Sequence, residues 1–214
     1  TLLCRFDGQR VTMASQMSEA DETVSSLYSV KSEQATMLSF DTYNYLVHYF
    51  GQPQGSMSDD PNGTLGGDYE FIISSASAER IELKGKKYGN RIVMKALTED
   101  QTWKQYLTKI KKVEDDAFFY EYDLLMDGLY TGQMLRSNYT FIVTYYDEIG
   151  KVHQKTVPFM FTADGMRFHE PVTIDGQTMQ NFVWKNELIS FVCTDEGATG
   201  IKLAGVYTAG YQSY

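Results

Sequence analysis

Apolar and polar residues alternate along many short segments of this chain, and this period of two most limits what the chain can fold into. In residues 80–84, Ile81 and Leu83 fall on one face of an extended strand and charged residues fall on the other. Strands with one wet face are typical of antiparallel sheets. The 16 Tyr and 12 Phe residues favour the same class, because aromatic side chains suit pleated, half-buried surfaces. The sequence therefore predicts a mainly β, antiparallel protein.

Turn signals rich in glycine, asparagine and aspartate separate the strand-like segments. Tight turns favour these residues because they tolerate a positive φ. The predicted strands are residues 1–6, 10–14, 27–30, 36–40, 69–73, 80–83, 91–96, 139–145, 157–161, 182–184, 188–193 and 205–207.

One segment follows a helical period instead. Within residues 99–113, apolar side chains recur at steps of three and four, which predicts an amphipathic helix. Thr98 and Gln101 have the spacing of a capping box at its start. We therefore expect an N-terminal β module over residues 1–97, a helix and connector over 98–134, and a C-terminal β module over 135–214. Each module is expected to be barrel- or sandwich-like.

The two β modules are predicted to be related to each other. Residues 6–11 resemble residues 163–168, and residues 37–40 resemble residues 188–191. The spacing between the paired motifs differs, and the polar stretch 15–26 can absorb the difference as a surface loop. Short β motifs also recur by chance, so duplication remains one of two interpretations.

The bulk composition excludes some functions. A formal net charge of −9 argues against a nucleic-acid or anionic-membrane partner, since both require a basic footprint. Cys4 and Cys193 lie in separate apolar segments, so buried thiols are the expectation and their pairing is left open. No apolar stretch is long enough for a spanning helix. The chain opens directly on a strand-like segment, which we interpret as a fragment whose N-terminus and targeting signal lie upstream.

The sequence contains no recognisable catalytic or metal-binding pattern. His48, His153 and His169 lack ligand spacing, and no nucleophile elbow, phosphate loop or dinucleotide fingerprint is present. The acidic loop 58–63 resembles a calcium loop, but Tyr69 occupies the position where a bidentate acid is needed. We therefore predict no catalytic residues, no metal, no cofactor and no enzymatic activity.

An aromatic cluster is the strongest candidate for a binding site. Tyr43, Tyr45, Tyr49 and Phe50 precede the long polar loop 51–67. Aromatic rings beside a polar loop suit stacking on a sugar or burial of a partner's side chain. Alternate residues such as Tyr43 and Tyr45 also fit a core-facing role, and solvent exposure distinguishes the two interpretations.

Several ordered motifs resemble a family of uncharacterised surface lipoproteins from gut Bacteroidetes. They are residues 81–91, with a Gly-Lys-Lys-x-Gly-Asn hairpin, and residues 7–13, 38–44 and 66–71. The resemblance implies a domain of unknown function, a cell-exterior location and a lipid anchor on the outer membrane, attached upstream of this chain. It also implies a possible SusD-like or other surface protein partner.

The expected function is that of a non-catalytic cell-surface accessory protein that binds a glycan or peptide for nutrient acquisition. The alternative is a structural or interaction component of a surface protein assembly. A binding module exposes aromatic rings, whereas a structural module buries them and presents an apolar patch or an unpaired edge strand elsewhere.

Overall fold

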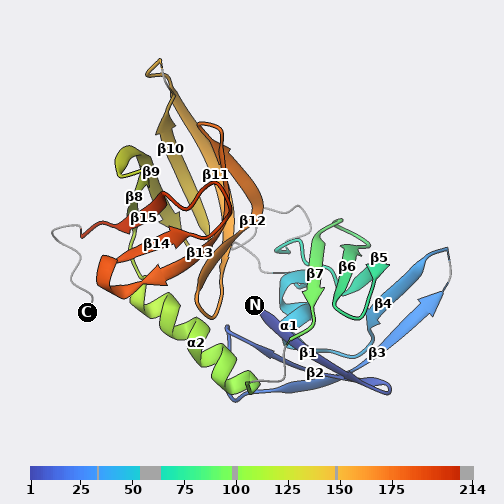
Figure 1. Ribbon diagram of the computed structural model, residues 1–214. Helices are drawn as coiled ribbons and strands as arrows, with labels where there is room; N and C mark the ends of the chain where they lie inside the picture. Colours follow the sequence, from blue (N-terminus) through green and yellow to red (C-terminus); the bar gives the residue numbers. More distant parts are fainter. Residues whose placement is uncertain (33, 54–63, 98–100, 148, 208–214) are drawn as a thin grey trace. The chain divides into compact units, whose positions relative to one another are not determined.

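The chain forms two compact units, residues 2–105 and residue 1 together with residues 106–214. The computed structural model describes residues 1–32, 34–53, 64–97, 101–147 and 149–207. Within them, nearly all regular structure is antiparallel β (Figure 1). The predicted class, mainly antiparallel β with two barrel-like modules, is confirmed.

The N-terminal unit contains one open sheet of seven strands, here called the half-barrel. Each strand pairs with the next along the chain, so the spatial order follows the sequence order. The strands are β1 (Leu2–Asp7), β2 (Arg10–Ser15), β3 (Val24–Ser32), β4 (Thr36–Phe40), β5 (Glu70–Ala76), β6 (Arg80–Gly85) and β7 (Arg91–Lys95).

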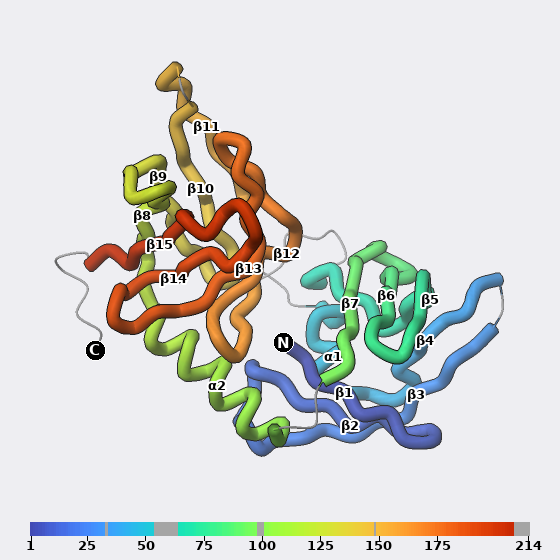
Figure 2. The backbone as a smooth tube through the Cα atoms, in the orientation of Figure 1, coloured from blue at the N-terminus to red at the C-terminus, as the bar shows by residue number. Residues whose placement is uncertain are grey.

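The C-terminal unit contains a closed barrel of eight strands, here called the closed barrel. Its last strand pairs with its first, in register Leu203 with Leu124, which completes the ring seen in Figure 2. The strands are β8 (Glu121–Met126), β9 (Leu129–Ser137), β10 (Thr140–Tyr146), β11 (Val152–Phe161), β12 (Gly165–Ile174), β13 (Gln177–Lys185), β14 (Ser190–Cys193) and β15 (Ile201–Gly205).

Large apolar side chains form the core of the closed barrel. Burial alternates along the strands, as at Tyr122, Leu124 and Met126 of β8. The Phe141 and Phe159 rings stack with centroids 4.3 Å apart, and Tyr122 meets Phe141 edge-on. A barrel of this strand number has an interior that side chains can fill. The period of two in the sequence thus directs one row of each strand into this core.

The half-barrel completes its core with a short helix, α1 (Tyr45–His48). Leu46 and Val47 of α1 are buried with residues of β2, β4, β5 and β6, including Val11 and Phe71. A single turn of helix has little stability alone, because nucleation is costly. Tertiary packing therefore stabilises α1.

The predicted amphipathic helix is α2 (Trp103–Asp116), which starts and ends a few residues later than expected. Its capping box is formed by Thr102 and Gln105: Gln105 N donates to Thr102 Oγ1 at 3.2 Å, and Thr102 N donates to Gln105 Oε1 at 2.9 Å. The predicted cap residue Thr98 lies outside the described residues. Among the described residues, no helix is both long and apolar enough to cross a membrane.

Three strands lie in segments where the sequence predicted none: β8, β9 and β12. The predicted connector 98–134 therefore contains β8 and the first part of β9 as well as α2. The β8–β9 turn has positive φ at Asp127 (50°) and Gly128 (82°), the geometry of a type I′ hairpin. The Asp-Gly pair was a usable signal for this hairpin.

Candidate functional site

Helix α1 begins at a cap that is deeply buried. Asn44 is fully buried, and its side chain accepts a hydrogen bond from Leu46 N at 3.1 Å and donates one to Ser26 Oγ at 3.1 Å. An asparagine at this position satisfies a helix N–H that has no partner within the helix. The cap therefore fixes the short helix, and with it the direction of the side chains on either side of Asn44.

An aromatic surface lies at the end of α1 and is formed by Tyr43, His48 and Tyr69. The His48 ring stacks on Tyr69 with centroids 5.0 Å apart and an interplanar angle of 13°. Tyr43 meets the same imidazole at 5.4 Å with a tilt of 45°. Tyr43 is 61% exposed and Tyr69 is 47% exposed. His48 Nδ1 lies 3.0 Å from Asn44 O, which holds the ring against the start of the helix.

The four aromatic residues singled out from the sequence divide into two pairs. Tyr43 and Tyr49 are exposed, at 61% and 39%. Tyr45 is half-buried against the half-barrel core, and its hydroxyl donates to Glu22 Oε1, which raises the pKa of that hydroxyl. Phe50 is half-buried, packs edge-on against Tyr49, and leaves no room for a Cβ at Gly67. Only Tyr43 joins the aromatic surface.

Sequence reasoning missed two members of this surface, His48 and Tyr69. Tyr69 lies beyond the polar loop, directly before β5, so its proximity to α1 arises from the fold. For His48, the sequence showed only that it lacks metal-ligand spacing. The spacing of Tyr43, His48 and Tyr69 carries no helical or strand period, so tertiary structure alone brings them together.

A buried carboxylate locks the segment before Tyr69 to the β6–β7 hairpin. Asp68 is 7% exposed, and its Oδ1 accepts from Lys87 N at 2.7 Å and from Tyr88 N at 3.2 Å. A Cβ on Gly85 would overlap the Asp68 carboxylate, so glycine is required there for close approach. Asn90 Nδ2 donates to Gly66 O across the same contact.

This interlock explains two of the motifs behind the family resemblance, residues 66–71 and 81–91. The Gly-Gly-Asp segment 66–68 and the Gly-Lys-Lys-Tyr-Gly-Asn segment 85–90 bind each other directly, and Thr64 Oγ1 lies 2.8 Å from the Tyr88 hydroxyl. Gly89 adopts a positive φ of 75°, as a tight turn requires, whereas Gly85 is needed for space. These motifs serve structure: they position Tyr69 beside α1.

The described residues also form hollows away from the aromatic surface. One of about 480 Å³ lies between the β1–β2 turn and strand β3, and Asp41, which follows β4, lies at its wall. The neighbouring Ser29 and Ser39 hydroxyls lower the pKa of Asp41. A second, of about 400 Å³, lies between α2 and the closed barrel beside Trp184. Lys109 and Lys112 line this second hollow.

The two cysteine thiols and the metal-ligating side chains were the first candidates for a reactive centre among the described residues. Burial raises the pKa of the Cys4 thiol to about 12 and that of the Cys193 thiol to about 11, so both are protonated at neutral pH. Both cysteines are free. Within the part of the chain that the structure describes, no three His, Cys, Asp or Glu residues lie together as a metal site. The acidic loop 58–63 lies outside the described residues.

Fold and site together define a two-module antiparallel β protein whose open module presents an aromatic surface. The chain belongs to the family described as Domain of unknown function (DUF4302), whose model matches residues 1–186. The match covers the half-barrel, α2 and the closed barrel as far as the end of β13. No curated protein and no solved structure gives a significant match.

Proposed function

We propose that this protein is a non-catalytic accessory protein of the cell surface that binds a glycan or a peptide, with a sugar ring as the preferred ligand. The observation that supports the proposal is the aromatic surface of Tyr43, His48 and Tyr69. Exposed aromatic faces carry a large apolar area at low conformational cost, and they attract the C–H faces of a sugar or the side chain of a peptide.

The geometry favours recognition rather than catalysis. The His48 ring contacts Tyr43 and Tyr69 and is held at Asn44, so its surroundings are aromatic rather than a paired carboxylate or nucleophile. A stacking surface of this kind binds a ligand that lies along it. Its rigidity derives from the buried Asn44 cap on one side and from the Asp68 interlock on the other.

The cellular context of the proposal derives from the family resemblance. We place the protein at the cell exterior of a Bacteroidetes bacterium, lipid-anchored to the outer membrane through a cysteine upstream of residue 1, in a nutrient-acquisition system with a SusD-like partner. Metabolic labelling of the full-length gene product with a radioactive fatty acid tests the anchor. Label that is absent from the protein contradicts this part of the proposal.

Binding is tested by isothermal titration and array screening of the purified chain against neutral glycans and peptides. Tyr43→Ala and Tyr69→Ala should each weaken binding by about tenfold, the value of one lost aromatic contact. Tyr120→Ala is the matched control, because Tyr120 is a 62% exposed tyrosine of the other unit. The proposal fails if the wild-type chain retains no glycan or peptide at about millimolar concentration.

A further inference from the structure

The β6–β7 hairpin is strongly basic within an acidic chain. Residues 80–95 contain six basic residues and one acidic residue, a formal charge of +5, whereas the whole chain carries −9. The cross-strand register pairs Arg80 with Lys95 and Lys84 with Arg91. Because side chains alternate between faces, these four cations share the outer face of the hairpin. Residues on the other face, such as Leu83 and Ile92, belong to the core.

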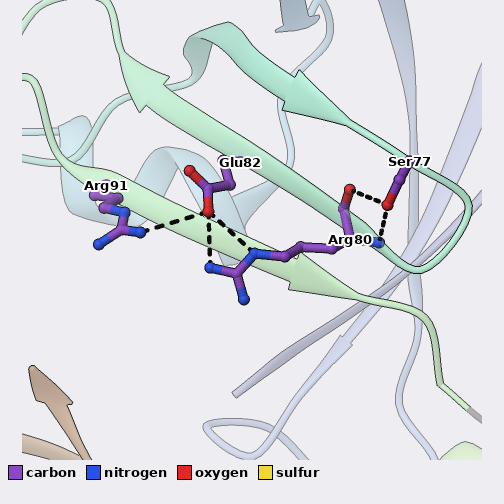
Figure 3. Close-up of polar contacts among 4 residues, drawn as sticks. All are labelled: Ser77, Arg80, Glu82 and Arg91. Carbon is purple, nitrogen blue, oxygen red and sulfur yellow. Dashed lines mark hydrogen bonds and ion pairs between the residues drawn. The ribbon is translucent and has the colours of Figure 1, made fainter. Parts of the chain in front are cut away.

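The acidic residue Glu82 organises part of this basic face. Glu82 Oε1 accepts hydrogen bonds from Arg80 Nε at 3.0 Å and Arg80 Nη2 at 2.8 Å, and lies 3.5 Å from Arg91 Nη2 (Figure 3). The hydrogen bonds from Arg80 lower the pKa of Glu82, so its carboxylate is ionised at neutral pH. Lys84 and Lys95 remain exposed beside this cluster.

Strand β7 is the last strand of the sheet, and among the described residues it pairs with β6 alone. Gly85 N donates to Asn90 O at 2.8 Å, and Ala96 N donates to Glu79 O at 2.9 Å. Both bonds join residues that face each other in the register. Because hydrogen-bonded and non-hydrogen-bonded pairs alternate, the even-numbered residues of β7 turn their backbone groups toward β6.

The odd-numbered residues of β7 therefore turn their N–H and C=O groups away from β6, toward the open edge. These residues are Arg91, Val93 and Lys95, and their side chains lie on the basic face. The open edge of β7 thus offers a partner two kinds of contact. One is a row of backbone N–H and C=O groups. The other is a pair of cations, Arg91 and Lys95, on either side of Val93, which is 38% exposed.

We propose that the edge of β7 binds an extended acidic segment of a protein partner by strand addition. An added strand places its own side chains beside Arg91, Val93 and Lys95 on the outer face. The fitting segment therefore carries Asp or Glu at positions i and i+4, with a β-branched or apolar residue at i+2. This surface consists of residues other than those of the aromatic surface and does not depend on the glycan proposal.

Two physical arguments select this occupant. Cations on an edge strand oppose pairing with a second copy of the same edge, so β7 is protected against self-association. An acidic strand removes that repulsion and satisfies the backbone groups as well. An anionic polysaccharide matches the charge but has no peptide N–H and C=O groups to continue the sheet, so the open backbone favours a polypeptide.

The test uses a fluorescein-labelled peptide, Thr-Glu-Thr-Val-Thr-Glu-Thr, titrated into the full chain with anisotropy as the readout. Binding should shift the backbone amide resonances of Arg91, Val93 and Lys95 in a nitrogen–proton NMR spectrum. The same peptide with Gln in place of both Glu should bind about tenfold more weakly, since two opposite-charge pairs are lost. Equal binding of the two peptides overturns the acidic specificity.

Variants of the protein separate the backbone contribution from charge. Val93→Pro removes an N–H that points to the open edge and leaves the β6 pairing intact, since proline is tolerated on edge strands. It should abolish peptide binding. The double variant Lys84→Glu/Lys95→Glu should weaken binding by tenfold or more, whereas Lys185→Glu, an exposed lysine of the closed barrel, should not change it.

The remaining outcomes are equally decisive. If Val93→Pro binds the acidic peptide as well as the wild type does, strand addition is wrong. Dextran sulfate tests the alternative of a general polyanion site. If it displaces the peptide, and the Val93→Pro variant binds the peptide and dextran sulfate as the wild type does, the face is such a site. Glu82→Gln is expected to strengthen peptide binding, because it removes the one acidic side chain from the face; a decrease with the fold retained contradicts the assigned geometry.

Discussion

The half-barrel and the closed barrel are built by the same rule, yet only one of them closes. In both, each strand pairs with its neighbour along the chain. In the closed barrel, β15 returns to β8, so every strand has two neighbours. In the half-barrel, β1 and β7 are the two ends of the sheet. Closure removes edges, whereas an open sheet leaves backbone groups to be covered or used.

The two units also fill their cores differently. Aromatic rings from neighbouring strands stack in the closed barrel, as with Phe141 of β10 and Phe159 of β11. The half-barrel instead inserts α1, with Leu46 and Val47 in its core. The aromatic surface, the Asp68 interlock and the basic edge all belong to the half-barrel. The proposed binding features thus all belong to the unit whose sheet is open.

The proposed duplication can be compared with this architecture. The first pair of similar motifs falls at the β1–β2 turn and the β11–β12 turn, and the second pair falls in β4 and at the start of β14. The motifs are therefore the same number of strands apart in each unit. They align β1 with β11, the fourth strand of the closed barrel, so a duplication requires a shift of three strands. It remains a hypothesis.

The largest predicted effect is the loss of stability when a core side chain of each unit is truncated, and it compares the two cores directly. Phe141→Ala should lower the free energy of unfolding of the closed barrel by about 3–5 kcal/mol, because a fully buried ring leaves a cavity that closed strands cannot fill. Leu46→Ala should cost the half-barrel about 2–3 kcal/mol, since α1 can shift into the space. Hydrogen exchange by mass spectrometry, resolved by unit, measures both. A larger loss for Leu46→Ala contradicts the view that closure makes the core rigid.

An intermediate effect tests the interlock of the half-barrel. Asp68→Ala leaves the N–H groups of Lys87 and Tyr88 without their acceptor and should cost about 1–3 kcal/mol. Gly85→Ala should also destabilise, because its Cβ overlaps the carboxylate.

The double variant of Asp68 and Gly85 should cost less than the sum of the single variants, since the overlapping carboxylate is gone. Chemical denaturation measures this cycle. Glu79→Ala, an exposed acidic residue of the same unit, should stay within about 0.5 kcal/mol of wild type. Strict additivity would show that Asp68 and Gly85 do not share one contact.

The smallest effect concerns pH and the closed barrel. Burial raises the pKa of Asp195, but hydrogen bonds from the Asn181 side chain at 2.6 Å, Asn181 N at 2.7 Å and Gln180 N outweigh it, so the pKa lies below its ordinary value of 3.8. A lowered folded-state pKa gives stability that is present above 3.8 and is lost as pH falls through the folded value.

Replacing Asp195 by Asn should therefore lower the free energy of unfolding at neutral pH. It should also make that free energy fall less steeply as the pH decreases into the acid range. Thermal unfolding from about pH 5 to pH 2 measures the change in slope. The half-barrel, followed by hydrogen exchange, is the internal control and should respond as in the wild type. An unchanged acid limb would mean that Asp195 does not titrate differently in the folded and unfolded states.

Strands and helices were predicted correctly where the alternation or the helical period of apolar residues was clear in the sequence. Strands with clean alternation, such as β6, were found, and so was α2 with its repeated apolar face. Strands β8 and β9 were missed although Asp127-Gly128 marks their hairpin. Strand β12 was missed because Glu170 and Pro171 interrupt its alternation. The helix start was placed too early, because Thr98 and Thr102 each precede a glutamine by three residues and spacing alone does not choose between them.

The candidate site was predictable only in part, for a similar reason. A concentration of aromatic residues around α1 is visible in the sequence, and Tyr43 was identified from it. Tyr45 and Phe50 belong to the same concentration but are half-buried. Exposure depends on which side of a short helix packs against the sheet, and the aromatic residues on both sides look alike in sequence.

The sequence by itself determined the strand class, the basic character of the 80–95 hairpin and the helical period of α2, because these depend on neighbours along the chain. Tertiary structure decided that the first sheet stays open and the second closes, that Asp68 enters the β6–β7 hairpin, and that Tyr69 stacks on His48. Those outcomes depend on contacts between residues distant in sequence, and local periodicity carries no information about such contacts.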